Sequence, residues 1–427
     1  MNGRRGSVWF SRRRVGRLYE DPPGTLHFAY DAQWLADDGF AVSLSLPLAR
    51  AEAPQEATGY FEGLLPEGAV RQRIARRYGV SAADAFGLLL AIGGDCAGAL
   101  SIGPADAPVE ADAPEPDALD EAVIASLARS GGRDMSLLGN QPQRFSLAGA
   151  QEKQPVSFDG VRYYLSGRQH PSTHILKFET VPRVCIAEYL ANRMAGAIGL
   201  PVVETEFVHL ADDAQMLRIG RFDRRTEADG KVARLHQEDL LQALGLPSML
   251  KYQREGGPSL AAVAGLLRDN LGRPVPAINR LRDWQMFNCL IGNWDGHAKN
   301  LAICYPNKDS LPELAPFYDL VAIEFLNRLS PGTWSRDMAF AVGGAYTPEL
   351  ITRDCWRRFA DELQIPHRPT LARLADLAES LPSLAEKAAA EFSDAHGHEN
   401  VLQRFVEATD RRCRQVLQSV RARARRA

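Results

Sequence analysis

The sequence predicts an α+β protein with a small β-rich lobe, a large all-helical lobe after it, and a small α+β subdomain in front of both. Residues 143–222 read as strands around one helix, and the chain beyond about 235 reads as mostly helical. A stretch rich in proline, alanine and acidic residues at 104–117 separates the first hundred residues from the rest. We therefore expect a subdomain at 1–103, a linker with a short helix at 104–140, a sheet lobe at 141–232 and a helical lobe at 233–427.

The composition is that of an ordinary globular protein and argues against several kinds of function. The 427 residues carry a net charge of −3, which disfavours nucleic-acid binding by bulk charge. Six cysteines without a C-x-x-C pair signal neither a zinc site nor a disulfide framework. Because no segment approaches the roughly 18 apolar residues of a membrane span, we expect a cytoplasmic protein with reduced thiols.

The first hundred residues predict short strands followed by helices. Strand-like runs occupy 8–10 and 26–30. Residues 58–78 are rich in leucine, alanine and arginine, which favours helical structure. Ser81-Ala82-Ala83-Asp84 resembles a capping box, with Asp in place of Glu, that opens a helix ending at Ile92.

A hairpin and further strands around one helix predict the sheet lobe. Asp159-Gly160 lies between two strand-like runs, which is a hairpin signal. Apolar residues recur at helical spacing after Val184, and Gly199-Leu200-Pro201 ends that helix. The expected elements are a helix near 118–129, strands at 155–158, 162–165 and 173–178, a helix at 184–198, and strands at 202–210 and 216–221.

The motif Asp-Gly-His-Ala-Lys-Asn, from Asp295 to Asn300, indicates phosphoryl transfer when it is taken together with Asp319. Protein kinases use one Asp to accept the proton of the attacking hydroxyl, an Asn five residues later to hold magnesium, and a later Asp to hold magnesium as well. These residue types suit a reaction that depends on positioning and on neutralising charge around the γ-phosphate. Taken alone, the motif also fits a polar turn.

Upstream residues supply candidates for binding a nucleotide. The small residues of Ala-Gly-Ala-Gln-Glu-Lys at 148–153 would let the backbone approach phosphate oxygens, although an ordinary turn fits as well. Lys177 lies in a strand-like run, where a kinase places its phosphate-binding lysine, and Glu188 on the next helix is its candidate ion-pair partner. The alternative for Lys177 is a solvated strand end. Residues 221–224 fit an interlobe hinge or a plain turn.

Taken in order, these motifs resemble the HipA family of serine/threonine kinases, which are the toxins of bacterial toxin–antitoxin pairs. The resemblance covers nearly the whole chain and implies a protein-kinase-like bilobal fold with ATP and Mg²⁺ as cofactors. It is carried by Ser-Leu-Ala-Gly-Ala-Gln-Glu-Lys at 146–153, Thr-His-Ile-Leu-Lys at 173–177, Arg-Phe-Asp-Arg at 221–224, Lys-Tyr at 251–252, the 295–300 motif and Pro-Phe-Tyr-Asp at 316–319.

The resemblance also implies a role for each matching residue. Asp295 would be the catalytic base, Asn300 and Asp319 would hold magnesium, and Ser146 would be the site of autophosphorylation. Gly220 departs from the family pattern, in which we expect an acidic residue at that position. The residues implied to contact the nucleotide are Ala148, Gly149, Ala150, Gln151, Glu152, Lys153, Lys177, Gly220, Arg221, Phe222, His297, Lys299 and Tyr318.

The expected function is therefore that of an ATP-dependent serine/threonine kinase toxin. The resemblance implies an aminoacyl-tRNA synthetase as the substrate, a small helix-turn-helix antitoxin as the partner, and contact with DNA only through that antitoxin. A small-molecule kinase is the alternative within the same class of enzyme. A catalytically weak co-repressor subunit is the alternative from another class.

Overall fold

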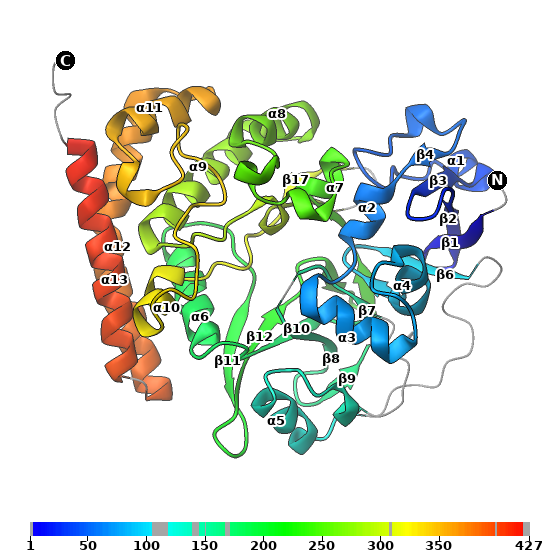
Figure 1. The fold of residues 1–427 in the computed structure, drawn as a ribbon, viewed down its shortest axis with the longest axis horizontal. Coiled ribbons are helices and arrows are strands. Elements are labelled where there is room, and N and C mark those ends of the chain that lie inside the picture. Colours follow the sequence, from blue (N-terminus) through cyan, green and yellow to red (C-terminus); the bar gives the residue numbers. More distant parts are fainter. Residues whose placement is uncertain are drawn as a thin grey trace. The chain divides into compact units, whose positions relative to one another are not determined.

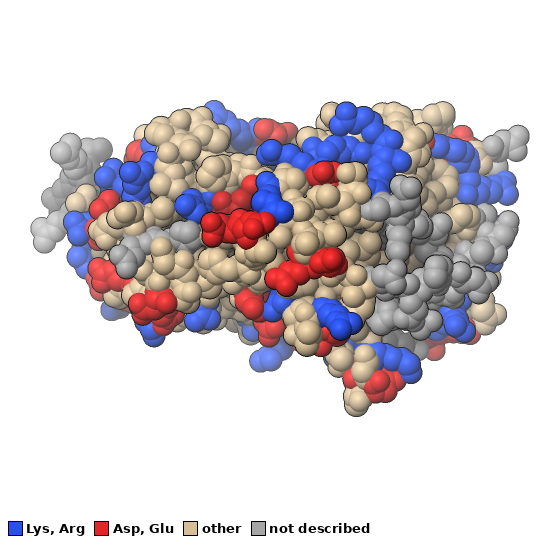
Figure 2. Space-filling view, turned by 90° about the horizontal axis from the view of Figure 1, so that it is seen from below, with Lys and Arg blue, Asp and Glu red and all other residues tan. Residues whose placement is uncertain are grey.

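A computed structural model describes residues 3–104, 118–138, 145–149, 151–166, 171–306, 310–397 and 399–421 (Figure 1). The chain forms two compact units. Unit 1 comprises Met1–Thr180, Glu204–Met249 and Ala302–Ser310, and unit 2 comprises Val181–Val203, Leu250–Leu301 and Leu311–Ala427. Both helices and sheets are present, which confirms the α+β class. Figure 2 shows that acidic and basic side chains both occur on the face drawn there.

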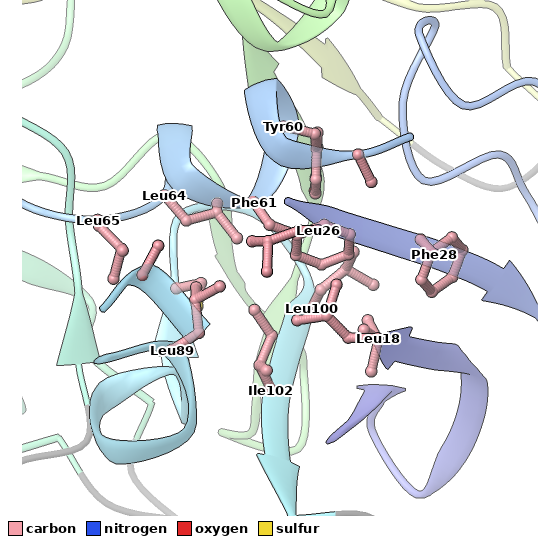
Figure 3. Close-up of a cluster of buried hydrophobic side chains, with 14 of the residues drawn as sticks. Leu18, Leu26, Phe28, Tyr60, Phe61, Leu64, Leu65, Leu89, Leu100 and Ile102 are labelled. Carbon is pink, nitrogen blue, oxygen red and sulfur yellow. The ribbon is translucent and has the colours of Figure 1, made fainter. Parts of the chain in front are cut away.

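The first hundred residues form an antiparallel sheet covered by helices around their own apolar core. The sheet has the order β4-β3-β2-β1-β6. Figure 3 shows Leu18 and Phe28 from the sheet packed with Phe61 and Leu89 from the helices, and all four are buried. The elements are β1 (Arg4–Phe10), β2 (Arg13–Glu20), β3 (Leu26–Tyr30), α1 (Ala32–Ala36), β4 (Gln55–Glu56), α2 (Thr58–Gly63), α3 (Gly68–Tyr78), α4 (Ala85–Ile92) and β6 (Leu100–Pro104).

The two predicted strands of this region are confirmed as parts of β1 and β3, and helical structure within 58–78 and up to Ile92 is confirmed as well, but the predicted capping box was wrong. The helical region at 58–78 is divided into α2 and α3 around Pro66, which lacks the N–H that a continuous helix needs. The cap of α4 is Asp84, whose Oδ1 accepts the Gly87 N–H at 2.8 Å. Ser81 instead accepts the Ala83 N–H in the preceding turn, so there is no capping box.

The second sheet of unit 1 has the order β11-β12-β10-β8-β9, with α5 (Glu121–Arg129) packed on it. Ile124 and Leu127 of α5 share a core with Leu176 and Phe178 of the sheet. The predicted short helix, the hairpin and the other strands are all confirmed. Their bounds are β8 (Lys153–Phe158), β9 (Tyr163–Leu165), β10 (His174–Phe178), β11 (Thr205–His209) and β12 (Gln215–Gly220).

Short strand pairs complete unit 1, and one of them lies within residues 233–427, where the sequence predicted an all-helical lobe. β15 (His236–Asp239) pairs with β16 (Ala302–Tyr305), which lies more than sixty residues later in the chain. Such pairing over a long distance leaves no local pattern in the sequence. The other elements are β5 (Asp95–Cys96), paired in parallel with β7 (Phe145–Ser146), then β13 (Arg224–Thr226), paired with β14 (Val232–Arg234), and α7 (Leu240–Leu244).

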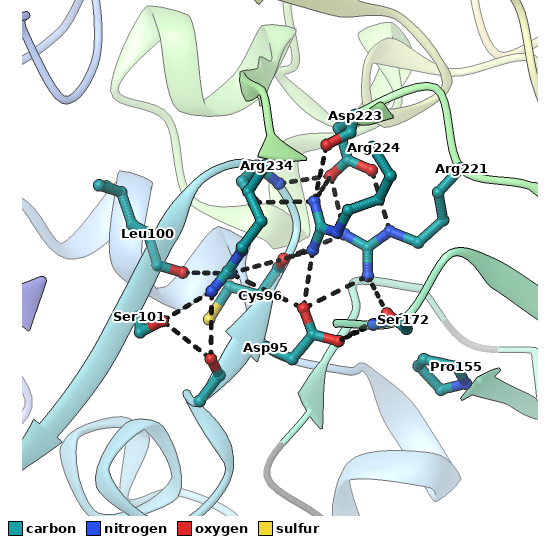
Figure 4. A network of polar contacts seen from close by, with 12 residues as sticks. Asp95, Cys96, Leu100, Ser101, Pro155, Ser172, Arg221, Asp223, Arg224 and Arg234 are labelled. Atoms are coloured by element: carbon teal, nitrogen blue, oxygen red, sulfur yellow. Dashed lines mark hydrogen bonds and ion pairs between the residues drawn. The ribbon is translucent and has the colours of Figure 1, made fainter. Parts of the chain in front are cut away.

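A buried group of charges, here called the arginine–aspartate cluster, joins β5 of the first subdomain to the end of β12 (Figure 4). Arg224 Nη2 lies 2.7 Å from Asp95 Oδ1, and Arg221 Nη2 lies 2.7 Å from Asp223 Oδ2. Although burial alone would raise it, the charges of Arg221 and Arg224 lower the pKa of Asp223 to about 2. The cluster consists of Asp95, Arg221, Asp223, Arg224 and Arg234.

Unit 2 is largely helical. α12 and α13 are long helices that pack side by side (Figure 1). α6 confirms the predicted helix at 184–198 and packs on α12, with the rings of Tyr189 and Phe392 5.6 Å apart. Within the described residues, no helix is both long and apolar enough to cross a membrane. The elements are α6 (Val184–Ala197), α8 (Leu260–Asn270), α9 (Pro274–Ile291), β17 (Glu313–Leu314), α10 (Ile323–Leu329), α11 (Arg353–Glu362), α12 (His367–His396) and α13 (Glu399–Arg421).

Short 3-10 helices lie in the connections of both units. They are η1 (Leu48–Arg50), η2 (Met135–Leu138), η3 (Ser248–Leu250), η4 (Gln253–Glu255), η5 (Ala298–Asn300) and η6 (Pro348–Leu350).

Candidate functional site

In unit 2, α9 ends at Ile291 and is followed by Gly292, three positions before the 295–300 loop. The backbone at this glycine leaves little room for a side chain. Gly292 has φ +72°, and a Cβ there would lie 2.3 Å from Glu324 Cβ. The loop then turns into η5, where the His297 N–H donates to Asn300 Oδ1 at 2.9 Å. The same asparagine places Nδ2 3.4 Å from Asp319 Oδ2. The structure therefore brings together the two residues implied as magnesium ligands, although 19 positions separate them in the sequence.

Asp295 is the exposed residue of this loop, whereas His297, Lys299 and Asn300 are buried. Its Oδ1 accepts a 2.7 Å hydrogen bond from the hydroxyl of Tyr252. An exposed carboxylate can accept a proton from a group that arrives from solvent. Sequence reasoning missed Tyr252, because the Lys-Tyr motif at 251–252 lies 43 positions before Asp295.

His297 is a neutral residue in this setting. Burial, assisted by the nearby charge of Lys251, lowers the pKa of His297 to about 3. Its imidazole therefore carries no charge at physiological pH and is a poor candidate for a proton carrier there. The ring of Tyr252 meets it edge-on, with the ring centroids 5.4 Å apart.

The segment that ends at Asp319 is held by backbone contacts and has a strained conformation. Phe317 donates its N–H to Pro201 O at 2.8 Å and accepts the Val203 N–H at 3.1 Å. The hydroxyl of Tyr318 donates to Lys299 O at 2.7 Å. Asp319 itself has φ +56°, a left-handed conformation that costs a non-glycine residue energy and occurs most often at functional sites.

In unit 1, the first subdomain anchors the segment at 146–153. Ser146 is fully buried, and its hydroxyl donates to Leu64 O at 2.7 Å. The Glu67 N–H donates to Gly149 O at 3.0 Å, and Arg73 on α3 forms an ion pair with Glu152. Ala150 lies outside the described residues. Both ends of the candidate phosphate loop are therefore fixed by residues that are far away in the sequence.

Lys177 is buried, so the alternative of a solvated strand end does not hold. In the sheet it lies directly opposite Lys153 of β8. Residues opposite one another in an antiparallel pair project from the same face, and two like charges placed in this way destabilise a sheet. An anion such as a phosphate would offset that repulsion. Glu188, the candidate partner of Lys177, is buried on α6.

Two backbone N–H groups of the candidate hinge are already used in hydrogen bonds within the protein. The N–H groups of Gly220 and Arg221 donate to Glu204 O and Thr173 O, both at 2.9 Å. The Arg221 side chain belongs to the arginine–aspartate cluster, so contacts with a nucleotide would have to come from backbone carbonyls or from Phe222. A Cβ at position 220 would lie 3.7 Å from Glu204 Oε2. An acidic residue there would face a second carboxylate, which gives a physical reason for the glycine.

Oxygen atoms of Asn300 and Asp319 suit magnesium, which prefers oxygen ligands and is usually bound through only one or two carboxylates together with phosphate oxygens. The described residues contain no group of three or more His, Cys, Asp or Glu side chains placed to hold a metal ion. The candidate pair thus fits a metal that arrives with a nucleotide better than it fits a permanent protein site.

Comparisons with known proteins cover most of the chain and agree with one another. The family model described as the HipA-like C-terminal domain matches residues 145–388, and that of the HipA N-terminal domain matches 6–103. The chain is 36% identical to a putative kinase, Y4mE, of Sinorhizobium fredii, over 97% of this chain and 99% of the relative. It is 28% identical to the serine/threonine-protein kinase toxin HipA of Shewanella oneidensis, over 86% of this chain and 85% of the relative.

A solved structure shows the same fold. It is that of Shewanella oneidensis HipA in complex with HipB and its operator DNA, with a TM-score of 0.83 and 25% identity over 97% of this chain and 98% of the other. The predicted α+β fold of the protein-kinase-like type is thereby confirmed.

Proposed function

The chain belongs to the HipA family, and we propose that this kinase acts as the toxin of a HipBA-like toxin–antitoxin module. Its curated relatives are named as a serine/threonine-protein kinase toxin and as putative kinases. The match to HipA in a complex with HipB and operator DNA supports a small HipB-like antitoxin as the partner. Contact with DNA would then be indirect, through that partner.

The observation that carries the proposal is the grouping of Asp295, Asn300 and Asp319 in unit 2. Asn300 and Asp319 lie within 3.4 Å of one another, and the exposed Asp295 belongs to the same loop as Asn300. We assign Asp295 as the base that accepts the proton of a serine or threonine hydroxyl. Asn300 and Asp319 would hold Mg²⁺, which neutralises phosphate charge during transfer.

ATP is the proposed phosphate donor. In unit 1, Lys153 and Lys177 lie opposite one another on one face of the sheet and would bind phosphate oxygens. The rest of the 148–153 loop would cover the phosphates, and residues 220–222 would contact the base. In unit 2, the assigned residues are His297, Lys299 and Tyr318. Glu188 stays the predicted ion-pair partner of Lys177.

Ser146 is the proposed site of autophosphorylation and self-inactivation. Its hydroxyl is buried and bonded to Leu64 O, so it cannot accept a phosphate in the position that the structure shows. The segment must first leave β5. A phosphoserine, with about −1.5 to −2 charges at pH 7, could not return to that apolar position and would repel ATP at the adjoining loop. Equal ATP affinity in the modified and unmodified forms would contradict this role.

The proposed substrate is an aminoacyl-tRNA synthetase, whose modification would stop translation. To test this, the chain is incubated with labelled ATP and a cell lysate, and the labelled protein is identified by mass spectrometry. Asp295→Asn serves as the matched control, because it removes the base and keeps the shape of the side chain. Labelling of a small molecule and not of a protein would contradict the substrate class. Equal growth arrest on expression of wild type and Asp295→Asn would contradict the toxin role.

A further inference from the structure

We propose that Tyr252 is a positioning residue whose hydroxyl holds the Asp295 carboxylate in the orientation that proton transfer requires. The inference rests on the proposed function, because it takes Asp295 as the base. The Tyr252 hydroxyl donates a 2.7 Å hydrogen bond to Asp295 Oδ1. This bond limits rotation of the carboxylate.

The backbone of Tyr252 is itself fixed. Its carbonyl accepts hydrogen bonds from the N–H groups of Glu255 and Gly257, each at 3.0 Å. A Cβ at position 257 would lie 2.2 Å from Leu250 O, so a glycine is needed for the chain to turn this closely. A tyrosine held by such a turn can impose its own position on a neighbouring side chain.

Hydrogen bonds also fasten this turn to the catalytic loop. The Ala298 N–H donates to Lys251 O at 3.3 Å, on the residue just before Tyr252. On the other side, the Gln253 N–H donates to Ala339 O at 3.1 Å, and the Ala339 N–H donates to Trp294 O at 3.0 Å. Lys251, before Tyr252, is thus bonded to Ala298, which follows Asp295. Gln253, after Tyr252, is connected through Ala339 to Trp294, which precedes Asp295. This arrangement fixes the distance between the phenol and the carboxylate before any substrate binds.

The chemistry of the pair favours a charged and oriented base. A tyrosine with an ordinary pKa of about 10 is a neutral donor at physiological pH. A hydrogen bond to a carboxylate stabilises its charged form, which is the form that accepts a proton. The charged groups that act on the neighbouring His297 are Lys251, Lys299 and Asp319. All of them are retained when only the Tyr252 hydroxyl is removed.

The test is Tyr252→Phe, which keeps the ring against His297 and removes only the hydroxyl. Transfer of labelled phosphate from ATP to the chain itself is measured against pH, with ADP release as a second readout. We expect kcat to fall about tenfold, because a hydrogen bond to a charged group is lost. The acidic limb of the pH profile should move up by about one unit, while KM for ATP stays unchanged. Tyr346→Phe is the matched control, since the ring of Tyr346 lies on Arg254, 5.7 Å from its guanidinium carbon.

The outcomes separate this inference from the function on which it rests. Suppose that Asp295→Asn is inactive but the acidic limb of the pH profile does not move in Tyr252→Phe. This result would overturn the positioning role of Tyr252 alone. A raised KM for ATP in Tyr252→Phe would point to a merely structural effect and would overturn it as well. Phosphoryl transfer by Asp295→Asn at the rate of wild type would instead overturn the assignment of the base.

Discussion

Replacing Asp95 by asparagine is expected to destabilise the protein by about 3–5 kcal/mol, the usual cost of breaking a buried ion pair. Asp95 Oδ1 lies 2.7 Å from Arg224 and less than 4 Å from Arg221 and Arg234. The arginine–aspartate cluster has three arginines and two aspartates, so the substitution would leave three positive charges with Asp223 alone. Asparagine keeps an oxygen that can accept from Ser172, so the loss should reflect charge and not shape.

The same cluster predicts how stability depends on pH. Burial alone would raise the pKa of Asp95, but the surrounding arginines hold it well below its usual range. A carboxylate whose pKa is depressed by folding contributes stability above its unfolded pKa of about 3.9 and loses it as the pH falls through the folded value. Wild type should therefore lose stability between about pH 4 and pH 2, the folded pKa of Asp223. Asp95→Asn should show a smaller loss over that range.

The assay is urea unfolding followed by tryptophan fluorescence at several pH values. Asp229→Asn is the control, because Asp229 forms an exposed ion pair with Lys231 that should contribute little. A midpoint for Asp95→Asn equal to those of wild type and Asp229→Asn would refute the reasoning. So would a wild-type stability that does not change between pH 4 and pH 2.

Three further predictions concern the candidate site. Asp319→Ala should weaken ATP binding in the presence of Mg²⁺ as much as EDTA weakens it in wild type. If calorimetry finds the ATP affinity unchanged both in the variant and in wild type with EDTA, Asp319 is not a magnesium ligand. Arg73→Ala should raise the apparent KM for ATP several-fold by releasing Glu152, and Arg73→Lys should restore part of the affinity; identical KM values would show that the ion pair does not position the loop. His297, with a pKa of about 3, should show no imidazole titration by NMR between pH 5 and 8, and a midpoint in that range would contradict its buried, neutral state.

Helices and strands that carry a local sequence pattern, such as a turn dipeptide or a run of strand-forming residues, were predicted correctly from the sequence. The Asp159-Gly160 hairpin and the strand that carries Lys177 form where they were predicted. β2 was missed because its arginines obscure the alternation of apolar residues, although Val15 and Leu18 are buried. The strands β15 and β16 depend on pairing across the chain, which no local pattern records.

The same distinction holds for the candidate site. Asp295, Asn300 and Asp319 were identified because their types and spacing carry the chemistry. Tyr252 was not assigned a role, because its meaning comes from a contact 43 positions away. The ion pair between Arg73 on α3 and Glu152 in the 148–153 segment could not be predicted either, because the two residues are far apart in the sequence. Candidates for the groups that act in the reaction were thus predicted from the sequence, and their roles stay predictions, while the residues that contact them were found only in the fold.

If the 148–153 segment binds ATP phosphates as proposed, its contacts would give the first subdomain a direct part in nucleotide binding. Leu64, Glu67 and Arg73 each hold a different point of the segment that runs from Ser146 to Glu152. A phosphate on Ser146 would break the first of these contacts and would separate β7 from β5, whose pairing includes Ser146 itself. The remaining contacts belong to the same short segment, so their loss should follow. Autophosphorylation would then act by detaching the loop from the subdomain that holds it, and no change at Asp295 would be needed.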